Sequence, residues 1–258
     1  MAYLSIWRES IPRLKQGIRY CTQHIPSDCP LCRCSARGGR LCDSCRLWVT
    51  QSMNSGQPRC PVCCLALPQA EPCPDCASLQ PAYDKVIAAF DYHEPGDLLI
   101  HRLKSQRNFS MAPMLAGLLV QAIQRAPLSL AKNTIVLCVP ASRASVLRRG
   151  FNPAAAVARS LASQLDLPYQ PQLLRRAREG AKQAHLSRTE RARSTQSLYA
   201  CTGYIPGAHI AVVDDVLTTG STLQGIARQL RAAGAASVCG LVLARTPYRP
   251  GVYPLDVV

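Results

Sequence analysis

The chain has 258 residues, of which 48% are hydrophobic and 14 are cysteines, and its 30 lysines and arginines outnumber 15 acidic residues to give a net charge of +15. This length allows a substantial core in one or two domains, and the charge favours anionic substrates or polyanions as partners. A membrane-spanning segment is disfavoured, because the longest uncharged run covers only residues 108–124 and contains Pro113.

Residues 1–25 carry isoleucine and leucine at roughly helical spacing and lack the apolar stretch of a signal peptide. We therefore expect a short N-terminal helical segment, a cytoplasmic location and no membrane insertion.

A cysteine repeat dominates residues 26–81. The pattern C-x2-C-x9-C-x2-C occurs twice, at Cys29, Cys32, Cys42 and Cys45 and again at Cys60, Cys63, Cys73 and Cys76. Each C-x2-C pair forms a tight turn, here called a knuckle. Two knuckles joined by a short hairpin can place four thiolates around one tetrahedral Zn²⁺. The sequence therefore predicts a double zinc ribbon with two structural zinc ions.

Other uses of these cysteines fit less well. A cytoplasmic location disfavours disulfides, and one iron–sulfur cluster would use only four of the eight thiols. Cys34 and Cys64 lie beside the knuckles and are alternative ligands, so the pairing of the knuckles stays open at this point.

Apolar strands and amphipathic helices alternate through residues 82–258. We expect strands at 86–92, 134–139, 210–213 and 238–244, and helices at 98–103, 112–126, 153–165 and from 222 to a stop at Gly234. Asn152 is the expected N-cap of the third helix, with Pro153 in its first turn. This order predicts an α/β fold whose mostly parallel sheet has right-handed connections.

Two stretches are rich in arginine. Arg143, Arg148 and Arg149 follow the strand at 134–139, where a ligand-binding edge is expected. The second stretch runs from Arg175 to Arg193 and contains only two glutamates. A charge run is usually a solvated face, and this alternative stays open for the second stretch.

The stretch Val212–Thr222 joins an apolar strand, two adjacent acids, a hydroxyl-rich turn and a helix start. Backbone N–H groups and the dipole at a helix N-terminus favour a bound phosphate, and Gly220 lets the backbone approach it closely. Asp214 and Asp215 are expected where the strand ends, and two carboxylates suit two ribose hydroxyls. No lysine follows the glycine, which excludes a Walker A loop. The alternative is a strand, turn and helix with two solvated aspartates.

This stretch resembles the motif with which type I phosphoribosyltransferases bind phosphoribosyl pyrophosphate (PRPP). The resemblance implies that Asp214 and Asp215 bind the ribose and help to position Mg²⁺. It also implies a 5′-phosphate site made of Thr218, Thr219, Gly220, Ser221 and Thr222. Candidates for the pyrophosphate are Arg143, Arg149 and Lys104.

The knuckles, the sequence Arg149-Gly150-Phe151-Asn152 and the stretch Val212–Thr222 together resemble the ComF family, from about Cys29 to about Arg245. Gln183, Leu186 and Arg191 match a central segment of that family, whereas Pro153 and Ser194 replace its usual Gln and Asn. The resemblance implies a type I phosphoribosyltransferase-like sheet at 82–258 behind a zinc-ribbon module at 26–81, linked to natural competence or DNA utilisation.

Two functions follow from this resemblance. The first is a PRPP-binding protein that serves DNA uptake, with single-stranded DNA or a DNA-uptake helicase as partner. The alternative is an active phosphoribosyltransferase of nucleotide or nucleobase metabolism with no DNA role. Aromatic residues are only 5% of the chain, so single-stranded DNA would be held by salt-sensitive phosphate contacts and not by base stacking. Phosphoribosyl transfer needs no catalytic nucleophile, and none is assigned.

Overall fold

The computed structural model describes residues 24–67, 72–105, 109–127, 130–177 and 198–247. Contacts divide the chain into two compact units, Met1–Trp48 and Val49–Val258. The expected helical segment at 1–25 lies almost entirely outside the described residues. The expected modules at 26–81 and 82–258 remain a prediction about how the chain is organised into domains.

The first unit carries a small hairpin. Strand β1 (Pro26–Asp28) pairs antiparallel with β2 (Ser35–Arg37), and helix α2 (Asp43–Thr50) follows. The hairpin brings the knuckle after β1 back towards the start of α2, which is the return that the cysteine spacing requires.

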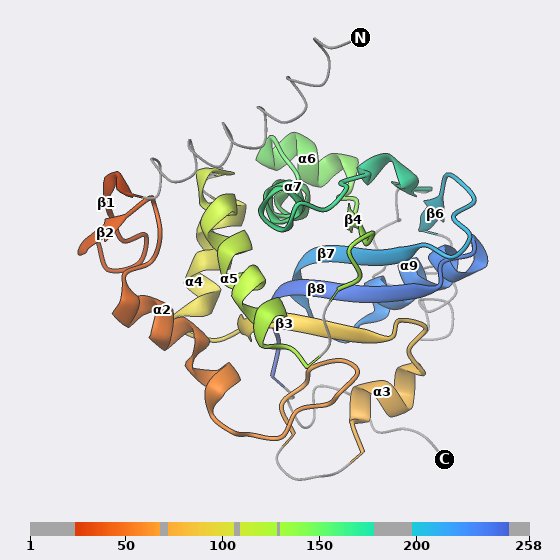
Figure 1. Ribbon diagram of the computed structural model, residues 1–258, viewed down its shortest axis with the longest axis horizontal. Helices are drawn as coiled ribbons and strands as arrows, with labels where there is room; N and C mark the ends of the chain where they lie inside the picture. Colours follow the sequence, from red (N-terminus) through yellow and green to blue (C-terminus); the bar gives the residue numbers. More distant parts are fainter. Residues whose placement is uncertain (1–23, 68–71, 106–108, 128–129, 178–197, 248–258) are drawn as a thin grey trace, which may run out of the picture. The chain divides into compact units, whose positions relative to one another are not determined.

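A four-stranded parallel sheet forms the centre of the second unit (Figure 1). Its order is β3 (Lys85–Asp91), β8 (Ser237–Arg245), β7 (His209–Leu217) and β4 (Ile135–Cys138). All three neighbouring pairs are parallel, which confirms the predicted sheet. The strands are apolar along most of their length because both faces of the sheet are covered.

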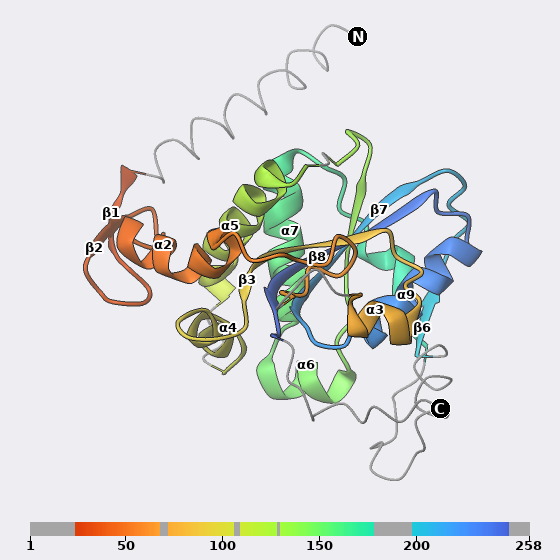
Figure 2. The same cartoon turned by 90° about the horizontal axis from the view of Figure 1, so that it is seen from below.

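Helices cover the two faces. Helices α5 (Ala112–Arg125) and α7 (Pro153–Leu165) pack on each other and on one face, as Figures 1 and 2 show. On the other face, α9 (Ser221–Ala232) places its apolar side chains in a core with residues of β3, β7 and β8. The remaining elements are η1 (Gln51–Asn54), α3 (Pro74–Leu79), α4 (Gly96–Ser105), η2 (Phe109–Met111), α6 (Arg143–Arg149), η3 (Pro171–Leu173), β5 (Leu174–Arg176) and β6 (Tyr199–Cys201).

The sequence Arg149-Gly150-Phe151-Asn152 shapes the turn between α6 and α7. Gly150 ends α6 with φ = 81°, a left-handed conformation that glycine adopts without strain. Asn152 accepts a hydrogen bond from the Ala154 amide at 3.1 Å and donates one to the Val139 carbonyl at 3.0 Å. This confirms the expected N-cap and ties the start of α7 to the residue that follows β4.

One boundary differs from the prediction. Strand β7 does not end at Val213 but continues to Leu217, so the loop before α9 is only Thr218–Gly220. The extension is paired on one side only, because β4 pairs with β7 up to Val213 whereas β8 pairs with it as far as Leu217. The extension of β7 could not be predicted from the run of apolar residues, because Asp214 and Asp215 interrupt that run.

Candidate functional site

Asp214 and Asp215 lie where β7 passes beyond the end of β4. The Asp215 amide donates a hydrogen bond of 2.8 Å to Asp214 Oδ1, which fixes the first carboxylate against the backbone. The Asp215 carboxylate forms an ion pair of 2.9 Å with Lys104 Nζ, from the last turn of α4. The structure therefore brings together two predicted ribose ligands and one predicted pyrophosphate ligand.

The negative charges of the Asp214 and Asp215 carboxylates repel each other. Burial, and then the negative charge of Asp215, raises the pKa of Asp214 from 3.8 to about 7, although the Asp215 amide and Lys104 act in the opposite direction. A carboxylate whose charge is so poorly compensated favours an added cation. Oxygen ligands of this kind are the ones that Mg²⁺ prefers, so the residues present fit a bound Mg²⁺.

Residues 218–222, here called the phosphate loop after their predicted ligand, run from the end of β7 into the first turn of α9. Gly220 is the N-cap residue of α9 with φ = 83° and has no side chain to occupy the first amides of the helix. Thr218 and Ser221 are exposed, and the Thr219 and Ser221 hydroxyl oxygens lie 2.8 Å apart. Free amides and several hydroxyls at one helix start are suited to a phosphate group.

Gly220 also lies against the segment that follows α3. A Cβ atom at this position would meet the Tyr83 hydroxyl at 2.9 Å and Leu79 Cδ2 at 3.2 Å. Glycine is therefore required twice, once by the backbone conformation and once by the close approach.

The substitution Gly220→Ala is expected to weaken PRPP binding by about tenfold, because the added methyl group displaces the loop as well as straining it. Gly207→Ala is the matched control: Gly207 has φ = 70° but nothing within 4 Å of its added Cβ. Both variants should lose about 1 kcal/mol of stability to backbone strain. Calorimetric titration with PRPP should separate them, and equal affinities would contradict this account of the loop.

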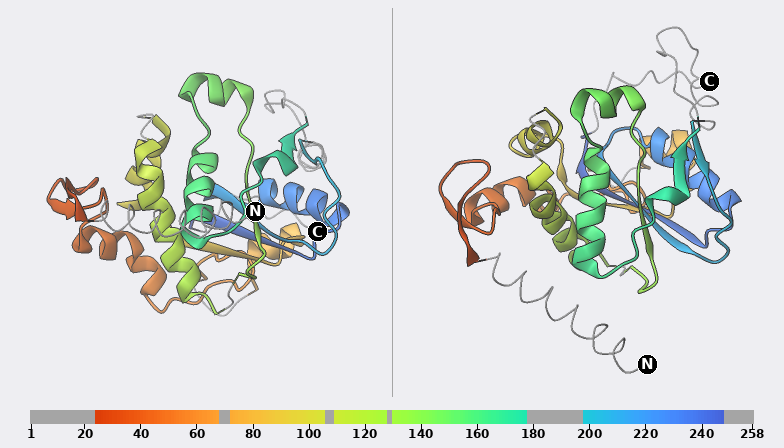
Figure 3. Two further views of the ribbon diagram at one scale, coloured as in Figure 1. Left: turned by 45° about the horizontal axis from the view of Figure 1, so that its top comes forward. Right: turned by 90° about the horizontal axis from the view of Figure 1, so that it is seen from above.

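The two predicted arginines lie on α6, which begins with Arg143 and ends with Arg149. This helix stands beyond the end of β4 and before α7 (Figure 3). Ser142 caps it by accepting a hydrogen bond from the Ser145 amide at 3.2 Å. Arg143 is exposed and Arg149 is half-buried, and their contact with pyrophosphate remains a prediction.

The second basic stretch is described only at its start. Arg175 and Arg176 belong to β5, and the Arg176 guanidinium lies over the Tyr199 ring at 5.8 Å from its centroid. The other predicted basic residues of this stretch, together with Gln183, Leu186 and Ser194, lie outside the described residues.

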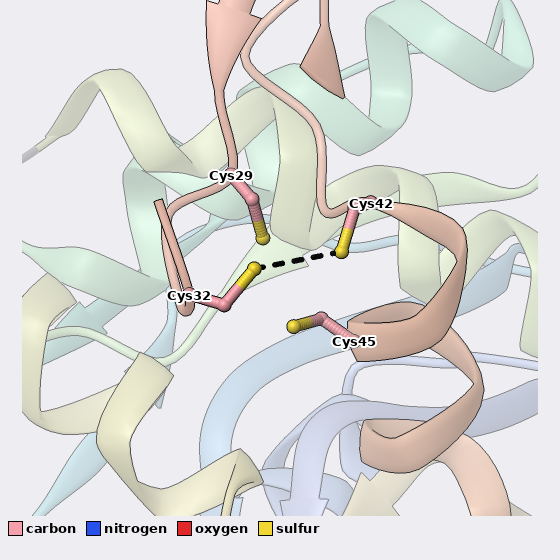
Figure 4. Close-up of side chains that lie close together, drawn as sticks. All are labelled: Cys29, Cys32, Cys42 and Cys45. Carbon is pink, nitrogen blue, oxygen red and sulfur yellow. Dashed lines mark hydrogen bonds between the residues drawn. The ribbon is translucent and has the colours of Figure 1, made fainter. Parts of the chain in front are cut away.

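The first group of four thiols lies in the first unit. The sulfur atoms of Cys29, Cys32, Cys42 and Cys45 all lie within 4.8 Å of one another and point towards a common centre (Figure 4). Burial works to raise the pKa of Cys29, yet backbone hydrogen bonds from Cys32, Cys42 and Leu31 lower it to about 6.

The second group, Cys60, Cys63, Cys73 and Cys76, meets the same condition in the second unit. The Cys60 and Cys76 sulfur atoms lie 3.6 Å apart, and those of Cys63 and Cys73 lie 3.4 Å apart. These are close to the S–S edge of about 3.8 Å that four Zn–S bonds of about 2.3 Å would give. Both groups can therefore hold zinc, with the knuckle pairing expected from the repeat, and Cys34 and Cys64 belong to neither.

The second group shares its core with the sheet. Cys60 and Cys63 are 5% and 1% exposed and pack in one cluster with residues of β3, β7 and α9. The Val86 amide of β3 donates to the Val62 carbonyl at 2.7 Å. Arg59, next to Cys60, forms an ion pair of 2.6 Å with the buried Asp91 at the end of β3.

Sequence reasoning missed two residues beside the loop. Arg245 ends β8 and is 1% exposed, and Gln224 of α9 is 5% exposed. The only signal for Arg245 was a charge that directly follows a long apolar strand.

None of the described helices is both long enough and apolar enough to cross a membrane.

Comparison with known proteins identifies the family. The family described as "Phosphoribosyl transferase domain" matches residues 116–251. "DNA utilization protein YhgH" of Salmonella typhimurium is 34% identical over 86% of this chain and 98% of that protein. "Competence protein F" of Haemophilus influenzae is 33% identical over 68% of this chain and 79% of that protein. A hypoxanthine phosphoribosyl transferase structure from Trypanosoma cruzi aligns over 54% of this chain and 65% of that chain, at 18% identity and a TM-score of 0.34.

The parallel sheet and the family match together support the predicted fold class. The chain therefore belongs to the phosphoribosyl transferase domain family and is a relative of the proteins named DNA utilization protein YhgH and competence protein F.

Proposed function

We propose that this protein binds PRPP with Mg²⁺ at the end of β7 and serves DNA utilisation. The observation that carries the proposal is the ion pair of Lys104 with Asp215, directly before the phosphate loop. One site then offers acceptors for ribose hydroxyls, a cation for pyrophosphate, and free amides for the 5′-phosphate.

Each group has a separate role in this proposal. Asp214 and Asp215 accept hydrogen bonds from the two ribose hydroxyls, and the amides and hydroxyls of residues 218–222 hold the 5′-phosphate. Lys104, Arg143 and Arg149 neutralise the pyrophosphate. Mg²⁺ would supply further neutralisation of the pyrophosphate when bound.

The two cysteine groups are proposed to hold one structural zinc each. Four thiols at tetrahedral spacing support this role, and each group uses all its cysteine ligands, which leaves no open position for a substrate. Zinc-binding thiolates persist in a reducing compartment, which supports a cytoplasmic location.

PRPP affinity should rise with pH. The pKa of Asp214 lies at about 7 because of its burial and the charge of Asp215. Below that pH the protonated carboxyl must lose its proton before it can bind Mg²⁺, so affinity should increase by about tenfold between pH 6 and pH 8. Titrations at several pH values measure this, with Mg²⁺ binding to PRPP alone subtracted. An affinity that stays flat would contradict the role of Asp214.

The DNA role and the enzyme role are separated by two assays. A PRPP-binding protein that handles DNA should bind single-stranded oligonucleotides with an affinity that falls steeply with salt, and should release no pyrophosphate across a panel of nucleobases and amines. Pyrophosphate release with one acceptor, and no oligonucleotide binding at low salt, would favour the alternative of an active phosphoribosyltransferase in nucleotide metabolism. The phosphoribosyl transferase family match is the observation that favours this alternative.

A further inference from the structure

The buried guanidinium of Arg245 joins the second cysteine group to the phosphate loop. On one side it donates to the Cys63 carbonyl at 3.1 Å, lies 3.7 Å from Cys63 Sγ, and pairs with the Asp75 carboxylate. On the other side it donates to the carbonyl oxygens of Leu217, at 3.3 Å, and Thr218. One side chain therefore touches a thiol ligand and the first residue of the loop.

The partners of Arg245 are placed by the cysteines. Cys63 is itself a ligand of the second group, and Asp75 lies in α3 between the ligands Cys73 and Cys76. Asp75 is 9% exposed and Arg245 is 1% exposed, so neither charge can turn to water if the other moves. The planar guanidinium, with its five donors, is suited to hold such a fixed arrangement.

A second set of contacts runs from the same helix to the start of α9. Gln224 donates to the carbonyl oxygens of Leu79 and Gln80, at 3.2 and 3.0 Å, and accepts from the Ala82 amide at 2.6 Å. Leu79 is the last residue of α3, and it approaches Gly220 as described above. Helix α3, which carries Cys76, therefore also contacts the loop at Gly220.

We propose that the metal-filled centre of Cys60, Cys63, Cys73 and Cys76 holds the phosphate loop in its binding conformation through Arg245. The predicted effect of this coupling on PRPP affinity rests on the proposed function. Without metal the four thiols are free to separate, and Cys63 and Asp75 no longer hold the guanidinium. The Leu217 and Thr218 carbonyls then lose a fixed donor, and the loop amides no longer converge on one point. Arg245 is a positioning residue, since it acts on the loop through the Leu217 and Thr218 carbonyls.

The test compares three variants of the full chain. Asp75→Asn and Arg245→Lys should each weaken PRPP binding by about tenfold or more, because the Leu217 and Thr218 carbonyls lose a fixed donor and the loop is displaced. Both should also speed hydrogen exchange in peptides that cover residues 217–222. Asp75→Asn should keep the zinc content of the wild type, because Asp75 is not a ligand. The effect on PRPP would then come from a residue that contacts the loop only through Arg245.

Arg59→Lys is the matched control. Arg59, next to Cys60, donates to the Cys64 carbonyl and pairs with the buried carboxylate of Asp91 at the end of β3, a strand that does not lead into the loop. It should lose stability like Arg245→Lys while keeping wild-type hydrogen exchange at residues 217–222. An effect of Arg59→Lys on the loop equal to that of Arg245→Lys would show a general loss of stability and overturn the proposal.

Hydrogen exchange separates this proposal from the proposed function. If wild-type protein does not bind PRPP, the proposed function fails, but exchange of residues 217–222 in zinc-loaded and chelator-treated wild type still decides the coupling. Because zinc removal is also expected to destabilise the whole sheet unit, the supporting result is faster exchange in the loop than elsewhere in that unit, both after zinc removal and in zinc-loaded Asp75→Asn. Unchanged loop exchange in both Asp75→Asn and Arg245→Lys overturns it.

Discussion

Replacing Asp214 and Asp215 together by asparagine is expected to weaken PRPP binding by at least about a hundredfold. Each carboxylate provides charge-assisted acceptors worth about 1.5–3 kcal/mol, and the pair also provides the charge that attracts Mg²⁺. Asparagine has nearly the same shape, so the backbone of β7 and its pairing with β8 should persist. Calorimetric titration with PRPP and Mg²⁺ measures the loss, and circular dichroism confirms the fold.

The single variant Asp214→Asn tests whether the loss of PRPP binding comes from a lost ligand contact or from a damaged fold. Because burial and the charge of Asp215 raise the pKa of Asp214 to about 7, the folded protein binds a proton there more tightly than the unfolded chain does. Wild-type stability should therefore fall as pH rises from about 4 to about 7 through this group. Asp214→Asn removes that loss and should be more stable than wild type at pH 8, by about 1 kcal/mol after allowance for solvent. A variant that is both less stable and unable to bind PRPP would mean that Asp214 has a structural role.

Loss of one ligand from the second cysteine group is expected to destabilise the whole sheet unit. Cys63 is 1% exposed and packs in the same core as β3, β7 and α9. Cys63→Ser should therefore lower the free energy of unfolding of that unit by several kcal/mol, on the order of 5, because metal binding is coupled to folding. Thermal unfolding should show a fall of roughly 10 °C or more in its main transition.

Cys32→Ser is the comparison for this prediction. Cys32 is exposed and belongs to the first unit. It should reduce the zinc content by one ion per chain, as Cys63→Ser does, while leaving the main transition in place. Equal shifts of the main transition in the two variants would contradict the claim that the second group, and not the first, belongs to the core of the sheet unit.

The four strands of the parallel sheet and helices α4, α5, α7 and α9 were predictable because their signals are local. The helix at 153–165 was predicted with its exact bounds, since Asn152 and Pro153 mark its start chemically. The end of α9 before Gly234, which has φ = 101°, was equally visible in the sequence. The spacing of the eight cysteines revealed the two repeats, but only the structure shows which knuckles pair.

Long-range contacts were beyond the reach of the sequence. The ion pair of Lys104 with Asp215 joins residues far apart in the chain, although Lys104 had been a candidate ligand. Nothing in the spacing of the cysteines shows that the second group shares a core with the sheet. The contacts of Arg245 with Cys63, Asp75 and Thr218 bring together three separate segments, and only the folded chain shows them.

The central claim, that the end of β7 is a PRPP site, is tested most directly by titrating the zinc-loaded wild-type protein with PRPP, with and without Mg²⁺. We predict saturable binding of one PRPP per chain that strengthens with Mg²⁺ and disappears in the variant with both Asp214→Asn and Asp215→Asn. No binding by the wild type, or equal binding by this variant, would contradict the claim.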